Sequence, residues 1–341
     1  ATPRGGGVTV RSKTPLAVAG VSVSQAGKPL LSGVDFSVNV SGDYTPQGWQ
    51  AEIAGLTAKS GGVVILALDA KAGQLAGKDQ PLAATGRLSA HLPGLLAQPA
   101  ANHALVLTGG EATVEFMARL ASRKEVQAKI ALQNLIADPK AGAEKLPAIS
   151  ADLRADIAAN GQIAINAPIL LERSGRKTDL SLAGTITPGK DGLTFDAQVS
   201  SSQLVVDDAK VLAAMLPGSP GQESAASETA GRKPVRDVAP AWAGLSGSLA
   251  VRLKKVVYSD TFQATDVAGT LRLDRGSLKL EGVRAGLGEG SEGKLNGAVT
   301  FDQAAPLPYA LKADLAVTGF DPAPLFRAMN PGQPATVEGR F

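Results

Sequence analysis

Few residues of this chain could carry out acid–base or nucleophilic chemistry. The sequence contains two histidines, His91 and His103, and no cysteine. A Ser-His-Asp triad would have to use one of these histidines, and no serine lies in the pattern of a nucleophile elbow. A zinc site of the usual Cys/His kind would need more such ligands than the chain has. We therefore expect two surface-loop histidines, no catalytic residue and no metal site.

Glu289 and Glu292 are the best candidates for a carboxylate pair that hydrolyses a glycosidic bond. A sugar site normally adds aromatic platforms, and the chain offers only two Trp and three Tyr residues. The same stretch, residues 288–293, matches the G-x-G-x-x-G pattern of dinucleotide-binding loops. That loop should open a helix, whereas residues 294–301 alternate like a strand, and the two glutamates would repel a pyrophosphate. A glycine-rich turn with solvated charges is the better interpretation.

Composition also argues against several classes of protein. The chain has 341 residues, 44% of them hydrophobic, with 39 Gly and only 4% aromatics. Lys and Arg exceed Asp and Glu by 34 − 31 = 3, and the charges are interspersed. This excludes the strongly basic surface of a nucleic-acid-binding domain and an acidic disordered tail. We expect a protein that is not an enzyme, uses no cofactor and binds no nucleic acid.

The ends of the sequence predict a piece of a longer protein. The chain begins without Met, and residues 335–341 look like a strand cut in mid-pattern. No segment reaches the ~18 uninterrupted apolar residues of a membrane helix. We expect any membrane anchor or targeting signal to lie outside this sequence.

The elements that must position any site follow a period of two. Residues 247–257, 271–273, 278–280, 295–301 and 311–317 place apolar side chains at alternate positions, which is typical of half-buried strands. Short Gly, Asp and Pro segments separate these runs, so successive strands should pair antiparallel. Candidate strands of the same kind fill the first half of the chain: 15–24, 33–40, 48–57, 61–70, 82–90, 110–118, 125–133, 149–158, 161–171, 178–187 and 193–205.

One hairpin can be specified residue by residue. If Arg275-Gly276 is a two-residue turn, Leu273 faces Leu278 and Leu271 faces Leu280, so four leucines share one face. The same register places Arg272 opposite Lys279, a like-charge pair that Glu281 on the diagonal would relieve.

Two short segments break the β pattern. Residues 207–216 and 321–330 each begin with Asp, carry apolar residues at helical spacing and end before Pro-Gly, which predicts two short helices, the second over 322–329. Residues 217–240 contain no aromatic residue and almost no large aliphatic residue before Trp242, which predicts a disordered linker. We expect a β-rich segment over 1–216, this linker, and a β-repeat unit over 241–341.

Three stretches resemble the C-terminal region of the AsmA family: 245–253, 266–285 and 290–302. That region repeats strands of the form Gly-x-Leu-x-Leu, followed by a Gly-Gly-x-x-x-Gly strand, and residues 321–329 resemble the short helix before its next strands. The resemblance is good over residues 199–341, whereas residues 1–198 share only the general pattern of alternating strands. Glu289-Gly290 stands where the family usually has Gly-Gly, so this turn departs from the pattern.

The resemblance implies a Gram-negative-type bacterial envelope protein, anchored in the inner membrane by an N-terminal helix, with a β-rich body in the periplasm. AsmA-like proteins are similar to bridge-type lipid transfer proteins, whose curved sheet forms an apolar groove for lipid tails. The expected partner is therefore a phospholipid or another acyl-chain lipid, and the expected role is lipid transport in support of outer-membrane assembly and integrity.

The residue pattern leads independently to a similar hypothesis. A long antiparallel, strongly twisted or curved sheet with one aliphatic face must cover that face or use it to hold an apolar ligand. A structural β-solenoid or adhesin-like stalk with a dry core is the alternative, followed by a polysaccharide-active enzyme. The candidate lipid-contacting residues are the apolar positions that alternate along the strands of the second half: Leu249, Val251, Leu253, Leu271, Leu273, Leu278, Leu280, Leu295, Val299, Phe301, Leu311 and Leu315.

Overall fold

The computed structural model confirms a mostly β fold with few short helices and a largely antiparallel sheet that does not close. The structure describes residues 2–4, 6–77, 80–100, 106–137, 145–190, 192–215, 240, 242–288, 290–305 and 307–329. Apart from Pro240, the predicted linker 217–240 lies outside these residues, so the predicted division there stays a prediction. Contacts between Cα atoms group the chain into two compact units.

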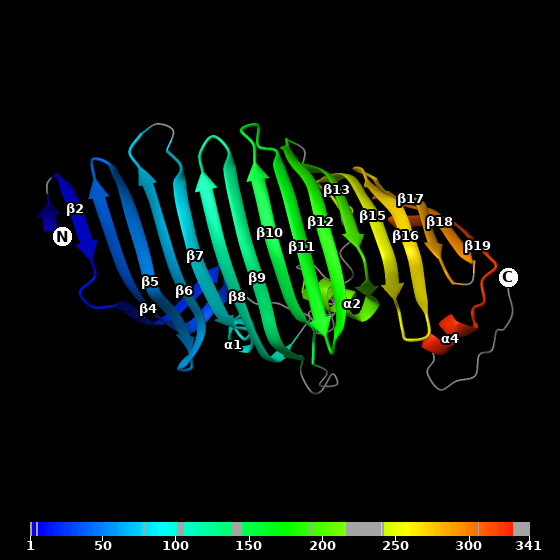
Figure 1. Cartoon of the computed structure of the whole chain (residues 1–341), viewed down its shortest axis with the longest axis horizontal. Helices are drawn as coiled ribbons and strands as arrows, with labels where there is room; N and C mark the ends of the chain where they lie inside the picture. Colours follow the sequence, from blue (N-terminus) through cyan, green and yellow to red (C-terminus); the bar gives the residue numbers. More distant parts are fainter. Residues whose placement is uncertain are drawn as a thin grey trace. The chain divides into compact units, whose positions relative to one another are not determined.

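The first unit comprises Ala1–Ala159, Leu171–Ser174 and Leu212–Ala226. Its elements are β1 Thr2–Arg4, β2 Gly7–Arg11, β3 Leu16–Gln25, β4 Lys28–Thr45, β5 Gly48–Ser60, β6 Val63–Leu75, β7 Leu82–His91, α1 Leu92–Leu96, β8 Leu107–Leu120, β9 Lys124–Ala137 and β10 Ala148–Ile157. From β3 to β10, each strand pairs antiparallel with the next (Figure 1). Strand β2 pairs with the second half of β4.

The second unit comprises Asn160–Leu170, Gly175–Val211 and Ser227–Phe341. Its elements, two of which cross into the ranges of the first unit, are β11 Ile163–Arg173, β12 Arg176–Gly189, β13 Gly192–Ser201, β14 Leu204–Val205, α2 Val206–Met215, β15 Leu245–Val257, β16 Gln263–Leu273, β17 Ser277–Gly286, β18 Glu292–Phe301, β19 Tyr309–Thr318 and α4 Ala323–Met329. Strands β15 to β19 form an antiparallel meander. Strands β13 and β14 pair with β15 in parallel, so the expectation that successive strands pair antiparallel was wrong at this point and the sheet is mixed.

The hairpin register predicted from the leucines is confirmed. Leu273 pairs with Leu278 and Leu271 with Leu280, and Arg272 lies opposite Lys279. The Nε of Arg272 donates to Glu281 at 2.6 Å, so the diagonal carboxylate offsets the like-charge pair. The register follows from the leucine positions because a slip by one residue would move all four leucines to the other face.

Several strands run further than their sequence pattern predicts, because glycines form bulges inside them instead of ending them. Strand β4 continues through Gly33, and β17 continues through Gly282, each with a φ near +60° that favours glycine. The bulge at Gly282 is held from the neighbouring strand, since its N–H donates to the Asn296 side chain at 2.7 Å. Gly20 and Gly55 donate to Asp35 and Asp69 in the same manner, at 2.8 and 2.7 Å.

The two predicted helices are present as α2 and α4, but the expectation of only two was wrong. The short helix α1 was missed because Pro93 and Gly94 look like a loop in sequence. Proline is tolerated in the first turn of a helix, where its missing N–H costs nothing. Helix α1 packs against β6, β7 and β8. Gly94 lies against Ile65, which belongs to a small core with Val34 and Ala58.

Candidate ligand-binding face

Strands β15 to β19 present an aliphatic face built by strand register. Leu249, Leu271 and Leu280 form one row across three strands. The next row continues from Leu273 through Leu278 and Val299 to Leu311. Because residues paired in register share a face, and side chains two apart along a strand also do, these rows lie on the same side of the sheet. We call this side the apolar face.

Every predicted lipid-contacting residue lies on the apolar face. Leu295 joins it through its pairing with Leu315, and Phe301 lies opposite Tyr309. Most of these side chains are half-buried, whereas Leu311 and Leu315 on β19 are 76% and 71% exposed. Every residue of β19 is exposed. The sequence therefore located the face, and the structure adds that β19 leaves its part of the face open.

The opposite side of the same strands is polar. Arg272 pairs with Glu281 there, and the Nζ of Lys294 lies 2.9 Å from Glu292. These pairs are more than 40% exposed, so each contributes little to stability. These pairs show that the two sides of strands β15 to β18 differ: one side carries charged groups, and the other carries aliphatic groups.

Aromatic side chains mark both ends of the apolar face. At one end, Phe301, Tyr309 and Trp242 make consecutive edge contacts, with ring centroids 5.2 and 6.1 Å apart. At the other end, Phe262 contacts Tyr258 and Phe320 at 6.5 and 6.3 Å. Edge-to-face contacts of this kind add about 0.5–1.5 kcal/mol each beyond the buried area. The aliphatic rows therefore lie between two aromatic clusters.

Asp274 fixes the turn beside the first aromatic cluster. Its carboxylate accepts hydrogen bonds from the N–H of Gly276 and from the N–H and hydroxyl of Ser277, at 3.1, 2.8 and 2.8 Å. The hydrogen bond from the Ser277 hydroxyl, with those from the two N–H groups, lowers the pKa of Asp274 below its ordinary value near 3.8. The Asp274 carbonyl accepts a hydrogen bond from Trp242 Nε1 at 3.0 Å, which ties the cluster to the turn.

We predict that Asp274→Ala lowers the free energy of unfolding by about 1 kcal/mol, the usual cost of losing such a side-chain-to-backbone cap. Because the folded pKa is depressed, this stabilisation is present above pH 3.8 and is lost as the pH falls through the lowered pKa. Urea unfolding followed by circular dichroism at pH 7 and at pH 2.5 measures both effects. Equal differences between wild type and variant at the two pH values would contradict the role of the ionised carboxylate.

The first unit carries a comparable aliphatic face, which the sequence reasoning did not assign to a site. Leu56, Leu68, Leu88, Val114 and Ile130 form one row across β5 to β9. Neighbouring rows on that side mix Ala and Gly with larger residues, as in Ile53, Ala70, Gly86, Phe116 and Ala128, which weakens the apolar alternation along the sequence. The large residues line up only across strands, so this face can be recognised from the sequence only if the strand registers are already known.

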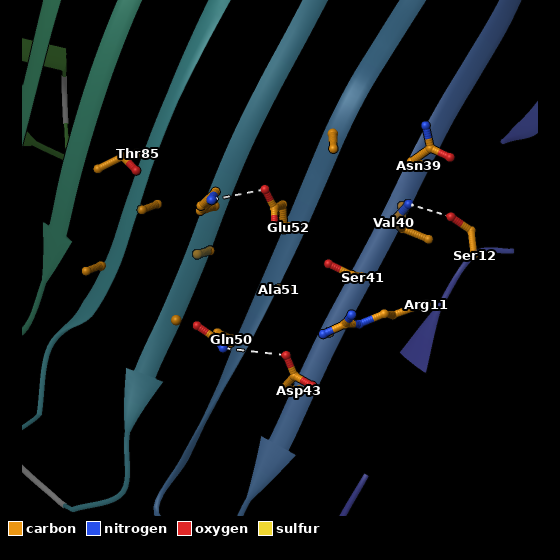
Figure 2. Close-up of a pocket in the computed structure, with 17 residues that line it drawn as sticks. Arg11, Ser12, Asn39, Val40, Ser41, Asp43, Gln50, Ala51, Glu52 and Thr85 are labelled. Carbon is orange, nitrogen blue, oxygen red and sulfur yellow. Dashed lines mark hydrogen bonds and ion pairs between the residues drawn. The ribbon is translucent and has the colours of Figure 1, made fainter. Parts of the chain in front are cut away.

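The polar side of the first unit contains a cavity of about 810 Å³ over β2, β4, β5, β6 and β7. Figure 2 shows its polar lining, in which the Gln50 side chain donates a hydrogen bond to Asp43. Glu52 forms an ion pair with Lys71 on the neighbouring strand β6, at 3.1 Å from its Nζ. Asp43 also accepts from the Thr9 hydroxyl at 2.6 Å. These carboxylates are engaged with their neighbours, so the cavity presents no free acid–base pair.

Of the residues considered for catalysis, the structure describes His91 and Glu292, and both have neighbouring partners. His91 acts as the N-cap of α1, where its Nδ1 accepts a hydrogen bond from Gly94 N–H at 3.3 Å. His103 and Glu289 lie outside the described residues, and Glu292 pairs with Lys294. Among the described residues, no group of three His, Asp or Glu side chains is arranged to hold a metal ion.

None of the described helices combines the length and the apolar character required to cross a bilayer.

Comparison with known proteins returns no relative: no protein-family model matches the chain, and no curated protein or solved structure is significantly similar to it.

Proposed function

We propose that this chain is a non-enzymatic, lipid-binding or lipid-conducting segment that holds acyl chains against the apolar face of β15 to β19. The observation that carries the proposal is the separation of the two sides of these strands. Aliphatic rows fill one side, and Arg272, Glu281 and Lys294 lie on the other. A sheet with this separation is suited to a ligand that is apolar along its length.

The exposure of β19 supports an apolar ligand more than a dry core. Leu311 and Leu315 continue the rows of Val299 and Leu295, yet most of their surface is exposed. An acyl chain covering them would gain about 0.8 kcal/mol for each CH₂ group removed from water. Passive binding of this kind needs no catalytic residue, because the side chains replace water around the ligand.

The resemblance to AsmA-like proteins supplies the setting of the proposal. In that setting the chain lies in the periplasm of a Gram-negative-type bacterium, tethered to the inner membrane by a segment outside this sequence, and moves phospholipid in support of the outer membrane. Protease digestion of spheroplasts tests the location in the full-length protein. Protection of this segment until the inner membrane is lysed would contradict a periplasmic location.

Lipid content is the decisive measurement for the binding function. The chain is purified from bacteria without detergent, extracted with organic solvent and analysed by mass spectrometry. We expect phospholipid in near-stoichiometric amounts. A lipid-free protein that unfolds cooperatively would contradict the proposal and would favour a structural β protein with a dry core.

A further inference from the structure

A row on the polar side of the second unit carries cations that no ion pair to Arg252 or Arg284 offsets. Ser200 pairs with Arg252, Arg252 with Ala268, Ala268 with Arg284, and Arg284 with Lys294. The row therefore places two arginines on either side of an alanine, and it contains no carboxylate.

The comparable row of the first unit shows the usual arrangement. There Asp69, Arg87, Glu115, Lys129 and Asp152 pair in that order across five strands, so every cation lies between two carboxylates. Opposite charges side by side on a sheet are favourable, and like charges are not. The row of Arg252 and Arg284 lacks this alternation, and no carboxylate on that row offsets their positive charges.

Two carboxylates, Asp179 and Asp266, lie near the row, and among the described residues neither forms an ion pair with Arg252 or Arg284. Lys294 at the end of the row is paired with Glu292. The carboxylate of Asp179 is occupied by hydrogen bonds from the N–H groups of Ser202 and Gln203, at 3.0 and 2.9 Å. Burial raises the pKa of Asp179, but these hydrogen bonds outweigh it and lower the pKa, so the group stays ionised at neutral pH.

Asp266, the other carboxylate near the row, lies at a bulge on the row of Lys254, between the pairs Leu253–Val267 and Lys255–Thr265. Within the described residues, the side chains of Arg252 and Arg284 have no ion-pair or hydrogen-bond partner.

Both arginines line a cavity of about 530 Å³ on this side of the sheet, together with Ser200, Ala268, Lys254 and the carboxylates of Asp179 and Asp266, so three cations face two carboxylates there. Two strand spacings, about 9.6 Å, separate their backbones. Ala268 between them carries only a methyl group, so no larger side chain of this row stands between the two arginines. Arginine is suited to such a ligand because its planar fork donates two parallel hydrogen bonds to a phosphate.

We propose that Arg252 and Arg284 form a binding site for a phosphate group, carried either by a phospholipid headgroup or by a free phosphate. The site lies on the polar side of β15 to β17, so it does not depend on the acyl-chain binding proposed for the apolar face. Failure of one proposal leaves the other intact.

The test measures binding by isothermal titration calorimetry with two probes, inorganic phosphate and dihexanoylphosphatidylglycerol kept monomeric in solution. The variant R252Q/R284Q removes both charges at nearly constant size. The control variant K279Q/K312Q removes two exposed cations from a more distant row on the same side of this unit. We expect R252Q/R284Q to bind at least tenfold more weakly than wild type, and K279Q/K312Q to bind like wild type.

The two probes distinguish the source of the phosphate. Binding of both, with the same loss in R252Q/R284Q, indicates a site for the phosphate group itself, and binding of the lipid alone indicates a headgroup site. The proposal is overturned if neither probe binds saturably or if R252Q/R284Q binds as tightly as wild type. Circular dichroism of each variant establishes that a loss of binding is not a loss of folding.

Discussion

The double variant Leu311→Asp/Leu315→Asp should lose most of the phospholipid that co-purifies with the wild-type chain, while its unfolding midpoint changes little. Both leucines are more than 70% exposed, so folding buries little of their surface and the charges remain in water. An acyl chain on the apolar face would instead meet two carboxylates, whose desolvation is costly. We expect at least a fivefold drop in extracted lipid, which mass spectrometry of the purified variant measures.

A matched control separates this effect from a general effect of added charge. Lys312 and Asp314 lie on the same strand between the two leucines and point to the polar side. Lys312→Asp should therefore retain wild-type lipid content, although it changes the local charge by two units. If Leu311→Asp/Leu315→Asp folds normally and keeps its lipid, the apolar face of β19 is not the place where acyl chains bind.

The register of the hairpin formed by β16 and β17 could be predicted from sequence because large aliphatic residues alternate on both sides of its turn. Leu271, Leu273, Leu278 and Leu280 admit one register in which all four share a face. Such a pattern is local, and its energetic consequence is large enough to determine the pairing.

Other features could not be predicted because their cause lies on a different strand. Gly282 looks like the end of a strand in sequence, but the Asn296 side chain across the sheet holds its N–H and lets β17 continue. The pairing of Arg252 with Ala268, which leaves Arg252 without a carboxylate, is likewise visible only once the registers are known. Helix α1 was hidden because a proline and a glycine stand in its five residues.

A glycine where β13 pairs with β15 is the position of the second substitution with a large expected effect on stability. These strands pair in parallel, with Phe195 opposite Gly247, Ala197 opposite Leu249 and Val199 opposite Val251. The pairing extends the apolar face from the meander onto β13, and it depends on the absence of a side chain at Gly247. The φ of Gly247 is +136°, and a Cβ built there would overlap the Phe195 carbonyl oxygen.

Gly247→Ala should therefore destabilise the second unit by about 3 kcal/mol, since the strained backbone and the steric overlap both oppose the native pairing. Hydrogen exchange should show loss of protection in β13 and at the start of β15, with unchanged protection in β5 and β6 of the first unit. Gly276→Ala is the control, because no heavy atom lies within 4 Å of its added Cβ and its φ is outside the left-handed region. Native protection of β13 in Gly247→Ala would mean that the parallel pairing does not need a glycine there, and the continuity of the apolar face across this junction would need another explanation.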